Sequence, residues 1–145
     1  MRIERCRRAR ARRWFARYVD DDSSTRISVF DFQGELVATA IGTVELGVPN
    51  LLYPKGRTVR LANVITLPWH RGQGYATALV RDVIAWVMDA DRVDLSATSE
   101  GQRIYEQLGF SFTSAPRMKL VLENSSRKRT STTGPVELMV GRRPG

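Results

Sequence analysis

The residues Arg71-Gly72-Gln73-Gly74-Tyr75-Ala76 lie between two apolar segments of different periodicity. Before them, residues 59–67 are rich in β-branched side chains with apolar residues at period two, which predicts a strand ended by Pro68. After them, apolar residues recur at helical spacing, which predicts a helix over residues 75–90. Two glycines beside an arginine let the backbone turn so that several N–H groups face one anion at the start of that helix. The stretch therefore predicts a phosphate or pyrophosphate site.

Two common nucleotide-binding fingerprints fit this stretch poorly. A Walker loop ends in Gly-Lys followed by Ser or Thr, whereas this loop ends in Gly-Tyr-Ala-Thr and has no lysine to reach a terminal phosphate. A dinucleotide-binding loop needs a third glycine, and position 77 is Thr. A pattern of two glycines alone is common in ordinary turns, so a second motif has to support any assignment.

The pattern Arg/Gln-x-x-Gly-x-Gly/Ala after a strand ended by proline does fit, and residues 66–76 resemble the cofactor signature of the GNAT superfamily of acetyl-CoA-dependent N-acetyltransferases. A second segment supports this resemblance. Residues 95–98 followed by residues 100–110 are similar to the next strand and helix of that family, which close on Tyr-x-x-x-Gly-Phe, here Tyr105 to Phe110. The resemblance covers roughly residues 28–122.

The resemblance implies an α/β fold with a GNAT-like mixed, mainly antiparallel central sheet, flanking helices and a shortened N-terminus. It also implies acetyl-CoA as the acetyl donor. The backbone of Val64, Ile65 and Thr66 would pair with the pantetheine arm as if it were another strand. Thr98 stands where many relatives have Asn and would make a weaker version of the same cofactor contact. The pyrophosphate would be held by the loop and the first helical turn, at Arg71, Gly72, Gln73, Gly74, Tyr75, Ala76 and Thr77.

The reaction implied is direct transfer of the acetyl group to a primary amine of an unidentified acceptor in a ternary complex. Tyr105 falls at the family position of the general acid, a role that suits a phenol with a pKa near about 10. The alternative is a helix aromatic that only packs. No general base stands out, because residues 59–67 lack the carboxylate that many relatives have there; Glu45 or a water ordered by Asn63 remain the candidates. His70 is interpreted as a surface or packing residue, and the side chain of Tyr75 as the start of the apolar helix face and not as a catalytic group.

The remaining pattern predicts strands at 26–32 and 36–44 joined by a turn at Gln33-Gly34, a loop over 45–58, a strand at 93–97, a helix at 100–108 and a strand at 118–122. Members of the family usually have a strand and two helices before this hairpin, and here only 25 residues precede it. These elements form part of the acceptor wall in the family. Either a partner subunit, for instance in a homodimer, supplies this wall, or the true start of the protein lies upstream.

The formal charge of +8 is concentrated at the two ends of the 145-residue chain. Residues 1–13 contain seven arginines and one glutamate, whereas residues 14–123 have a net charge of −2, from eleven basic and thirteen acidic residues. We therefore divide the chain into an Arg-rich, partly helical segment (1–25), an acetyltransferase-like domain (26–122) and a basic polar tail (123–145) with a candidate strand at 136–140. The arginines are interpreted as a solvated helix face, with nucleic-acid binding as the less favoured alternative.

The composition also bears on compartment and partners. No apolar run approaches the roughly 20 residues of a membrane span, and no signal-type segment follows the N-terminus, which favours a cytoplasmic protein without a membrane partner. Cys6 is the only cysteine, so an intrachain disulfide and a cysteine metal cluster are excluded, and no metal site is predicted. The expected partner is a small-molecule or peptide amine. The alternative function is a catalytically degenerate acyl-CoA-binding module, or a module of the same fold that binds nucleic acid or a protein partner.

Overall fold

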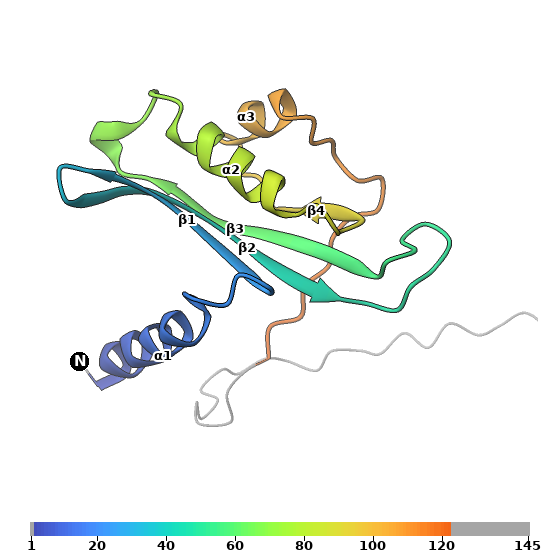
Figure 1. The fold of residues 1–145 in the computed structure, drawn as a ribbon, viewed down its shortest axis with the longest axis horizontal. Helices are drawn as coiled ribbons and strands as arrows, with labels where there is room; N and C mark the ends of the chain where they lie inside the picture. Colours follow the sequence, from blue (N-terminus) through green and yellow to red (C-terminus); the bar gives the residue numbers. More distant parts are fainter. Residues whose placement is uncertain (1, 123–145) are drawn as a thin grey trace, which may run out of the picture. The chain divides into compact units, whose positions relative to one another are not determined.

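The computed structural model describes residues 2–122, with side chains from residue 9 onward (Figure 1). The tail at 123–145, with the strand predicted at 136–140, lies outside the described residues. The chain divides into two units, residues 1–111 and residues 112–145. The first unit contains, in order, α1 (Arg2–Tyr18), β1 (Thr25–Phe32), β2 (Glu35–Leu46), β3 (Arg57–Thr66), the short 3-10 helix η1 (Pro68–His70), α2 (Tyr75–Trp86), β4 (Arg92–Asp94) and α3 (Gln102–Gln107).

The four strands form one mixed sheet in the order β1-β2-β3-β4. The first three strands are antiparallel neighbours, and β4 runs parallel to β3. At the predicted turn, Gln33 and Gly34 have φ of +53° and +80°, and Asp31 Oδ1 accepts a 2.9 Å hydrogen bond from the Gly34 N–H. Positive φ at both central residues matches the twist of the flanking strands. The mainly antiparallel α/β fold is thus confirmed.

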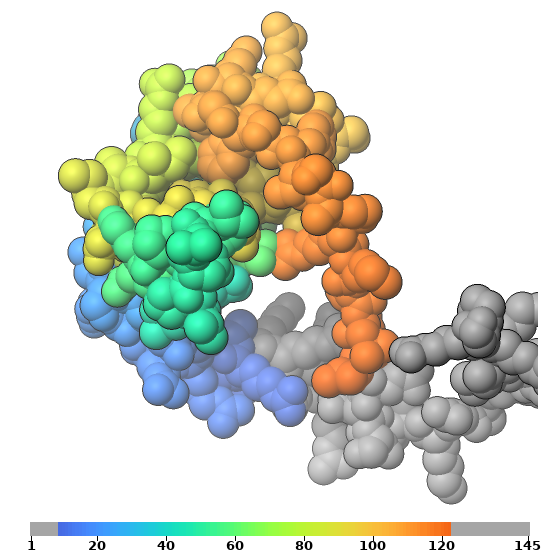
Figure 2. Space-filling view, turned by 90° about the vertical axis from the view of Figure 1, so that its right-hand side faces the viewer, coloured from blue at the N-terminus to red at the C-terminus, as the bar shows by residue number. Residues whose placement is uncertain are grey.

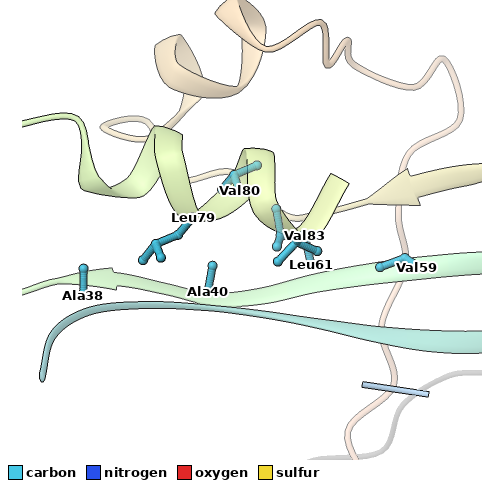
Figure 3. Close-up of a cluster of buried hydrophobic side chains, with 7 residues drawn as sticks. All are labelled: Ala38, Ala40, Val59, Leu61, Leu79, Val80 and Val83. Atoms are coloured by element: carbon cyan, nitrogen blue, oxygen red, sulfur yellow. The ribbon is translucent and has the colours of Figure 1, made fainter. Parts of the chain in front are cut away.

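The hydrophobic core lies between one face of the sheet and α2 (Figure 3). Alternate residues of β2 and β3 point to this face, as expected for strand geometry, and meet one side of the helix. The buried cluster consists of Ala38, Ala40, Val59, Leu61, Leu79, Val80 and Val83. Gly42 lets the helix approach β2 closely, because a Cβ there would lie only 2.6 Å from Val83 Cγ1. The core therefore holds α2, and with it the glycine loop, at a defined position on the sheet.

The N-terminal segment forms α1, as the helical interpretation of the arginines predicted. The chain then turns through residues 19–24, where Asp21 accepts hydrogen bonds from the hydroxyls of Ser23 and Ser24 at 2.5 and 2.6 Å. Among the described residues, α1 is the one element before β1. No helix within residues 2–122 is both long and apolar enough to cross a membrane.

Several predicted boundaries need correction. Helix α2 ends at Trp86, not near residue 90, because Val87 has φ −85° and ψ 49° and leaves the helical conformation. The strand predicted at 93–97 is reduced to β4, and the one predicted at 118–122 is wrong, since residues 112–122 contain no regular element. Met118 and Leu120 are 93% and 84% exposed, so among the described residues their side chains cover no apolar surface.

The long loop predicted between the second and third strands is confirmed over residues 47–56. Asn50 Oδ1 accepts hydrogen bonds from the backbone N–H groups of Leu52 and Tyr53, at 2.9 and 3.0 Å, and the Gly47 N–H donates to Gly56 O at 2.8 Å. In Figure 2 the loop faces the viewer, and its side chains form a green mass that protrudes from this side of the molecule. Hydrogen bonds within the loop thus define its shape.

Candidate active site

An opening between β3 and β4 is the central feature of the candidate site. The two strands pair only over three positions, Thr58 with Arg92, Val59 with Val93 and Arg60 with Asp94. Beyond Arg60, β3 continues to Thr66 with β2 as its partner, while the chain after Asp94 is irregular. An edge that lacks a neighbouring strand presents backbone N–H and C=O groups to a ligand. Val64, Ile65 and Thr66, which the sequence suggested for pantetheine, lie on this part of β3.

A β-bulge bends β3 within this opening. Thr39 of β2 is opposite Ile65 and Ile41 is opposite Ala62, so two residues of β3, Asn63 and Val64, face a single residue of β2. Asn63 has φ +51°, a left-handed conformation that Asn tolerates better than most residues. Bulges bend the strand and increase its twist. Sequence analysis missed this role of Asn63, although an Asn within a β-branched run was the available signal.

The glycine loop leads from β3 through η1 into α2. Gly72 and Gly74 have φ of +77° and +81°, and no atom would lie within 4 Å of a Cβ added at either position. Gly74 is the N-cap of α2, with no side-chain capping hydrogen bond and no acidic residue in the first turn. The first N–H groups of a helix have no partner within the helix, and the helix dipole there favours an anion. The loop thus has the backbone geometry and the open space that a pyrophosphate requires.

Arg71 and Tyr75 fix the loop at its two ends. Arg71 Nε donates a 3.1 Å hydrogen bond to the carbonyl oxygen of Thr66 and so ties the loop to the end of β3. The Tyr75 ring stacks on Phe30 of β1, with centroids 4.0 Å apart, and its hydroxyl lies 3.2 Å from Gln73 Oε1. The ring of His70 lies 5.3 Å from that of Phe32. The His70 ring thus packs beside β1, and Tyr75 begins α2 with its ring packed on the same strand.

Tyr105 of α3 lies half-buried beside the core. Its ring packs edge-on against Phe110, with centroids 5.9 Å apart, and also against the cluster around α2. Burial raises the pKa of the phenol above its ordinary value, because the charged phenolate is poorly solvated there. Within residues 2–122 the Tyr105 hydroxyl makes no hydrogen bond to the protein. Tyr105 is therefore a protonated hydroxyl at neutral pH that can donate to a ligand.

Thr98 lies close to Tyr105 at the start of α3. Its Oγ1 accepts a 3.2 Å hydrogen bond from the Gly101 N–H, and its carbonyl oxygen accepts from the N–H groups of Gly101 and Gln102 at 3.1 and 3.0 Å. A Cβ on Gly101 would lie 3.1 Å from Tyr105 Cε2 and 3.4 Å from Thr98 Oγ1. The predicted cofactor residue Thr98 thus has a structural function, and its hydroxyl proton is left for a second partner.

The carboxylates near the opening come from the strands on either side of β3. Strand β3 itself carries no carboxylate between Arg57 and Thr66. Glu45 of β2, a candidate base in the sequence, pairs with Arg60 at 3.4 Å, and Asp94 of β4 pairs with Arg92 at 3.1 Å. Among the described residues, no group of three or more His, Cys, Asp or Glu side chains is arranged to hold a metal ion.

The structure brings several predicted site residues around one core. Val64 of the β3 edge, Tyr75 at the start of α2 and Tyr105 of α3 all pack against the buried cluster. Helices α2 and α3 lie on the same face of the sheet (Figure 1). The free edge, the glycine loop and a protonated phenol are thus parts of one arrangement, as an extended ligand with an anionic end requires.

A family-level comparison matches residues 2–110 to the acetyltransferase (GNAT) family. This region begins before the resemblance seen at residues 28–122, since it takes in α1, and it ends just before the second unit. The comparison with curated proteins found no match.

Three solved structures illustrate the likeness of the fold. A predicted acetyltransferase with acetyl-CoA from Clostridium acetobutylicum is 22% identical, with a TM-score of 0.66 over 75% of this chain and 71% of that one. A GCN5-related N-acetyltransferase from Ralstonia eutropha is 23% identical, with a TM-score of 0.66 over 77% and 74%. Glucosamine-6-phosphate N-acetyltransferase from Arabidopsis thaliana is 22% identical, with a TM-score of 0.62 over 76% and 75%. With the match over residues 2–110 and the strand, loop and helix described above, this chain belongs to the GNAT acetyltransferase family.

Proposed function

We propose that this protein is an acetyl-CoA-dependent N-acetyltransferase that acts on a primary amine by direct attack in a ternary complex. The observation that carries the proposal is the continuity of the free β3 edge with the uncapped start of α2, through a loop with two left-handed glycines. The free edge of β3 can form backbone hydrogen bonds with amide groups, and the start of α2 can bind a pyrophosphate. Coenzyme A has both in one molecule. Membership of the family supports the same donor.

Each part of the surface has a defined task in this proposal. The backbone of Val64, Ile65 and Thr66 pairs with the pantetheine arm, on the part of β3 that extends beyond its last pair with β4. The amides at residues 72–77 bind the pyrophosphate, with the charge of Arg71 beside them. The remaining assigned residues, Gln73, Tyr75, Ala76 and Thr77, contribute through this backbone, and Thr98 through its hydroxyl.

Tyr105 is the general acid. When bound, acetyl-CoA supplies an activated acyl carbon, and the neutral amine forms the new C–N bond there as the C–S bond breaks. The Tyr105 hydroxyl gives its proton to the leaving sulfur, and the surplus proton on nitrogen is lost to solvent, from which Tyr105 is reprotonated. The raised pKa of Tyr105 keeps the proton in place at neutral pH until the sulfur becomes basic.

A catalytically degenerate acyl-CoA-binding protein is the second candidate. It is favoured by the absence of any carboxylate on β3, the strand where many relatives have one. Such a protein would bind the donor through the same loop and edge but would not accelerate its reaction with amines. The two candidates therefore differ in turnover and agree in binding.

Thiol release from acetyl-CoA in the presence of a panel of amines separates these candidates. For the enzyme, at least one amine accelerates release, and Tyr105→Phe lowers kcat by about 10- to 1,000-fold while acetyl-CoA still binds. The matched control is Tyr18→Phe on α1, which should retain wild-type kcat. Binding of acetyl-CoA without acceleration by any amine would leave the degenerate module, and absence of binding would exclude both.

A further inference from the structure

We propose that the acetyl acceptor carries an anionic group beside its amine, as an α-amino acid does, and that a charged cluster at the closed end of the β3–β4 opening recognises it. This inference rests on the proposed function and names the substrate class of the same site. The charged cluster consists of two arginines and two carboxylates, namely Glu45, Arg60, Arg92 and Asp94.

The four side chains lie on one face of the sheet. Val59 belongs to the buried cluster beneath α2, and Val44 and Val93 pack against it. Successive side chains of a strand point to opposite faces, so the neighbours of these valines point away from α2. The ion pairs within the charged cluster agree with this placement, because they join side chains of the same face.

The charged cluster also lies at the point where the strands separate. Arg60 and Asp94 form the last paired position of β3 and β4, and the opening begins with the next residue. A donor anchored at the glycine loop would run back along the β3 edge from Thr66 toward this position. Its acyl group would then come near the charged cluster, where an acceptor has to bind for direct attack.

The contacts in the charged cluster leave capacity for a ligand. Arg60 donates to Glu45 through Nε at 3.4 Å, and a guanidinium has four further N–H donors in a fork that matches a carboxylate. The Arg92 guanidinium lies 4.1 Å above the ring of Tyr53, which holds it in place next to Asp94. The side chains of Arg60 and Asp94 are 24% and 28% exposed. Both are thus partly shielded from water, which strengthens their interaction with charges, and both remain reachable.

The balance of charge selects the substrate class. The charged cluster carries two positive and two negative groups, so a polyamine would meet two arginines and a dianion would meet two carboxylates. A zwitterion satisfies both signs, with its ammonium group at Asp94 and its anionic group at Arg60. The ammonium group loses a proton to solvent before attack, because only the neutral amine is a nucleophile.

The experiment compares matched acceptors in the thiol-release assay: glycine with glycinamide, L-phenylalanine with its amide, and ornithine with putrescine. Each pair differs in one carboxylate. Since a hydrogen bond to a charged group contributes about 1.5–3 kcal/mol, kcat/KM should be roughly 10- to 150-fold higher for the carboxylate member. The amides have the more weakly basic amine, so a difference in amine reactivity alone would favour them.

Substitutions at Arg60 test whether this residue causes the preference for the carboxylate member of each pair. Arg60→Met should bring the ratio of the two kcat/KM values close to one, and Arg60→Lys should restore part of it. Arg81→Met, at an exposed arginine of α2, is the control that should retain the wild-type ratio. A preference that survives Arg60→Met overturns the assignment. If the wild-type protein uses both members of each pair equally, the inference about the acceptor is wrong but the N-acetyltransferase proposal stands. If no amine accelerates thiol release, both proposals are wrong.

Discussion

Replacing Gly74 with Ala tests whether the start of α2 binds the pyrophosphate. Gly74 has φ +81°, and an added Cβ would meet no atom within 4 Å, so the cost of the substitution is conformational and not steric. A non-glycine residue in the left-handed region costs about 1–2 kcal/mol. Gly34, in the turn between β1 and β2, has φ +80° and equally open surroundings. Gly34→Ala is therefore a matched control with the same backbone cost at a site remote in sequence from the loop.

The two variants should lose similar stability but differ in binding. We expect each to lower the free energy of unfolding by about 1–2 kcal/mol. Relaxation of Gly74→Ala away from its left-handed conformation would also turn first-turn N–H groups away from the ligand. The loss of one hydrogen bond to a charged group costs about 1.5–3 kcal/mol, which corresponds to a roughly 10- to 150-fold higher Kd for acetyl-CoA. Gly34→Ala should retain the wild-type Kd.

Denaturant unfolding measures the stability of both variants, and titration calorimetry measures their Kd for acetyl-CoA. The reasoning is refuted if Gly74→Ala loses the expected stability but binds acetyl-CoA as the wild-type protein does. It is also refuted if the two variants weaken binding equally, since the effect would then be a general consequence of lower stability.

Three further predictions concern the scaffold. Gly42→Ala places a Cβ 2.6 Å from Val83 Cγ1, so overpacking should lower stability by about 1–3 kcal/mol; an unchanged denaturation midpoint would contradict the close approach of α2 to β2. Arg26 holds the pKa of Asp82 below its ordinary value, so this stabilisation is complete above the unfolded-state pKa of about 3.9 and is lost as pH falls through the folded-state pKa. The Tm difference between wild type and Asp82→Asn should accordingly shrink as pH falls below about 4, and a constant difference would exclude this linkage. Asn63→Ala should cost about 1 kcal/mol whereas Asn63→Gly should not, because only glycine adopts φ +51° freely; equal melting temperatures would argue against the left-handed bulge.

The local parts of the fold could be predicted because their signals lie in neighbouring residues. The period of residues 59–67, the two glycines and the helical spacing after them define strand, loop and helix without long-range information. The hairpin at Gln33-Gly34 is local in the same way. The Arg-rich segment has high helix propensity, and the structure places α1 there.

The parts that failed depend on partners far away in the chain. Val87 continues the helical spacing of α2, but its backbone leaves the helix, and Asp89 pairs instead with Lys55 before β3. Apolar and polar side chains alternate over residues 118–120 as they do in a strand. A strand also needs a neighbouring strand to pair with, and alternation alone does not provide one. The separation of β3 from β4 after Arg60 depends on how two segments far apart in the sequence pair, and neighbouring residues do not reveal this. The assigned roles of Tyr105, Thr98 and the loop residues stay predictions until a ligand is bound.

The free edge of β3 has a consequence for solubility. An unpaired strand edge can recruit a strand from another molecule and so begin aggregation. The bulge limits this risk, because Asn63 interrupts the regular spacing of backbone groups, and Pro68 prevents the pairing from extending past the end of the strand. The bulge on the free edge thus also protects this edge from other chains. A ligand that pairs with this edge should slow aggregation of the protein as well as bind to it.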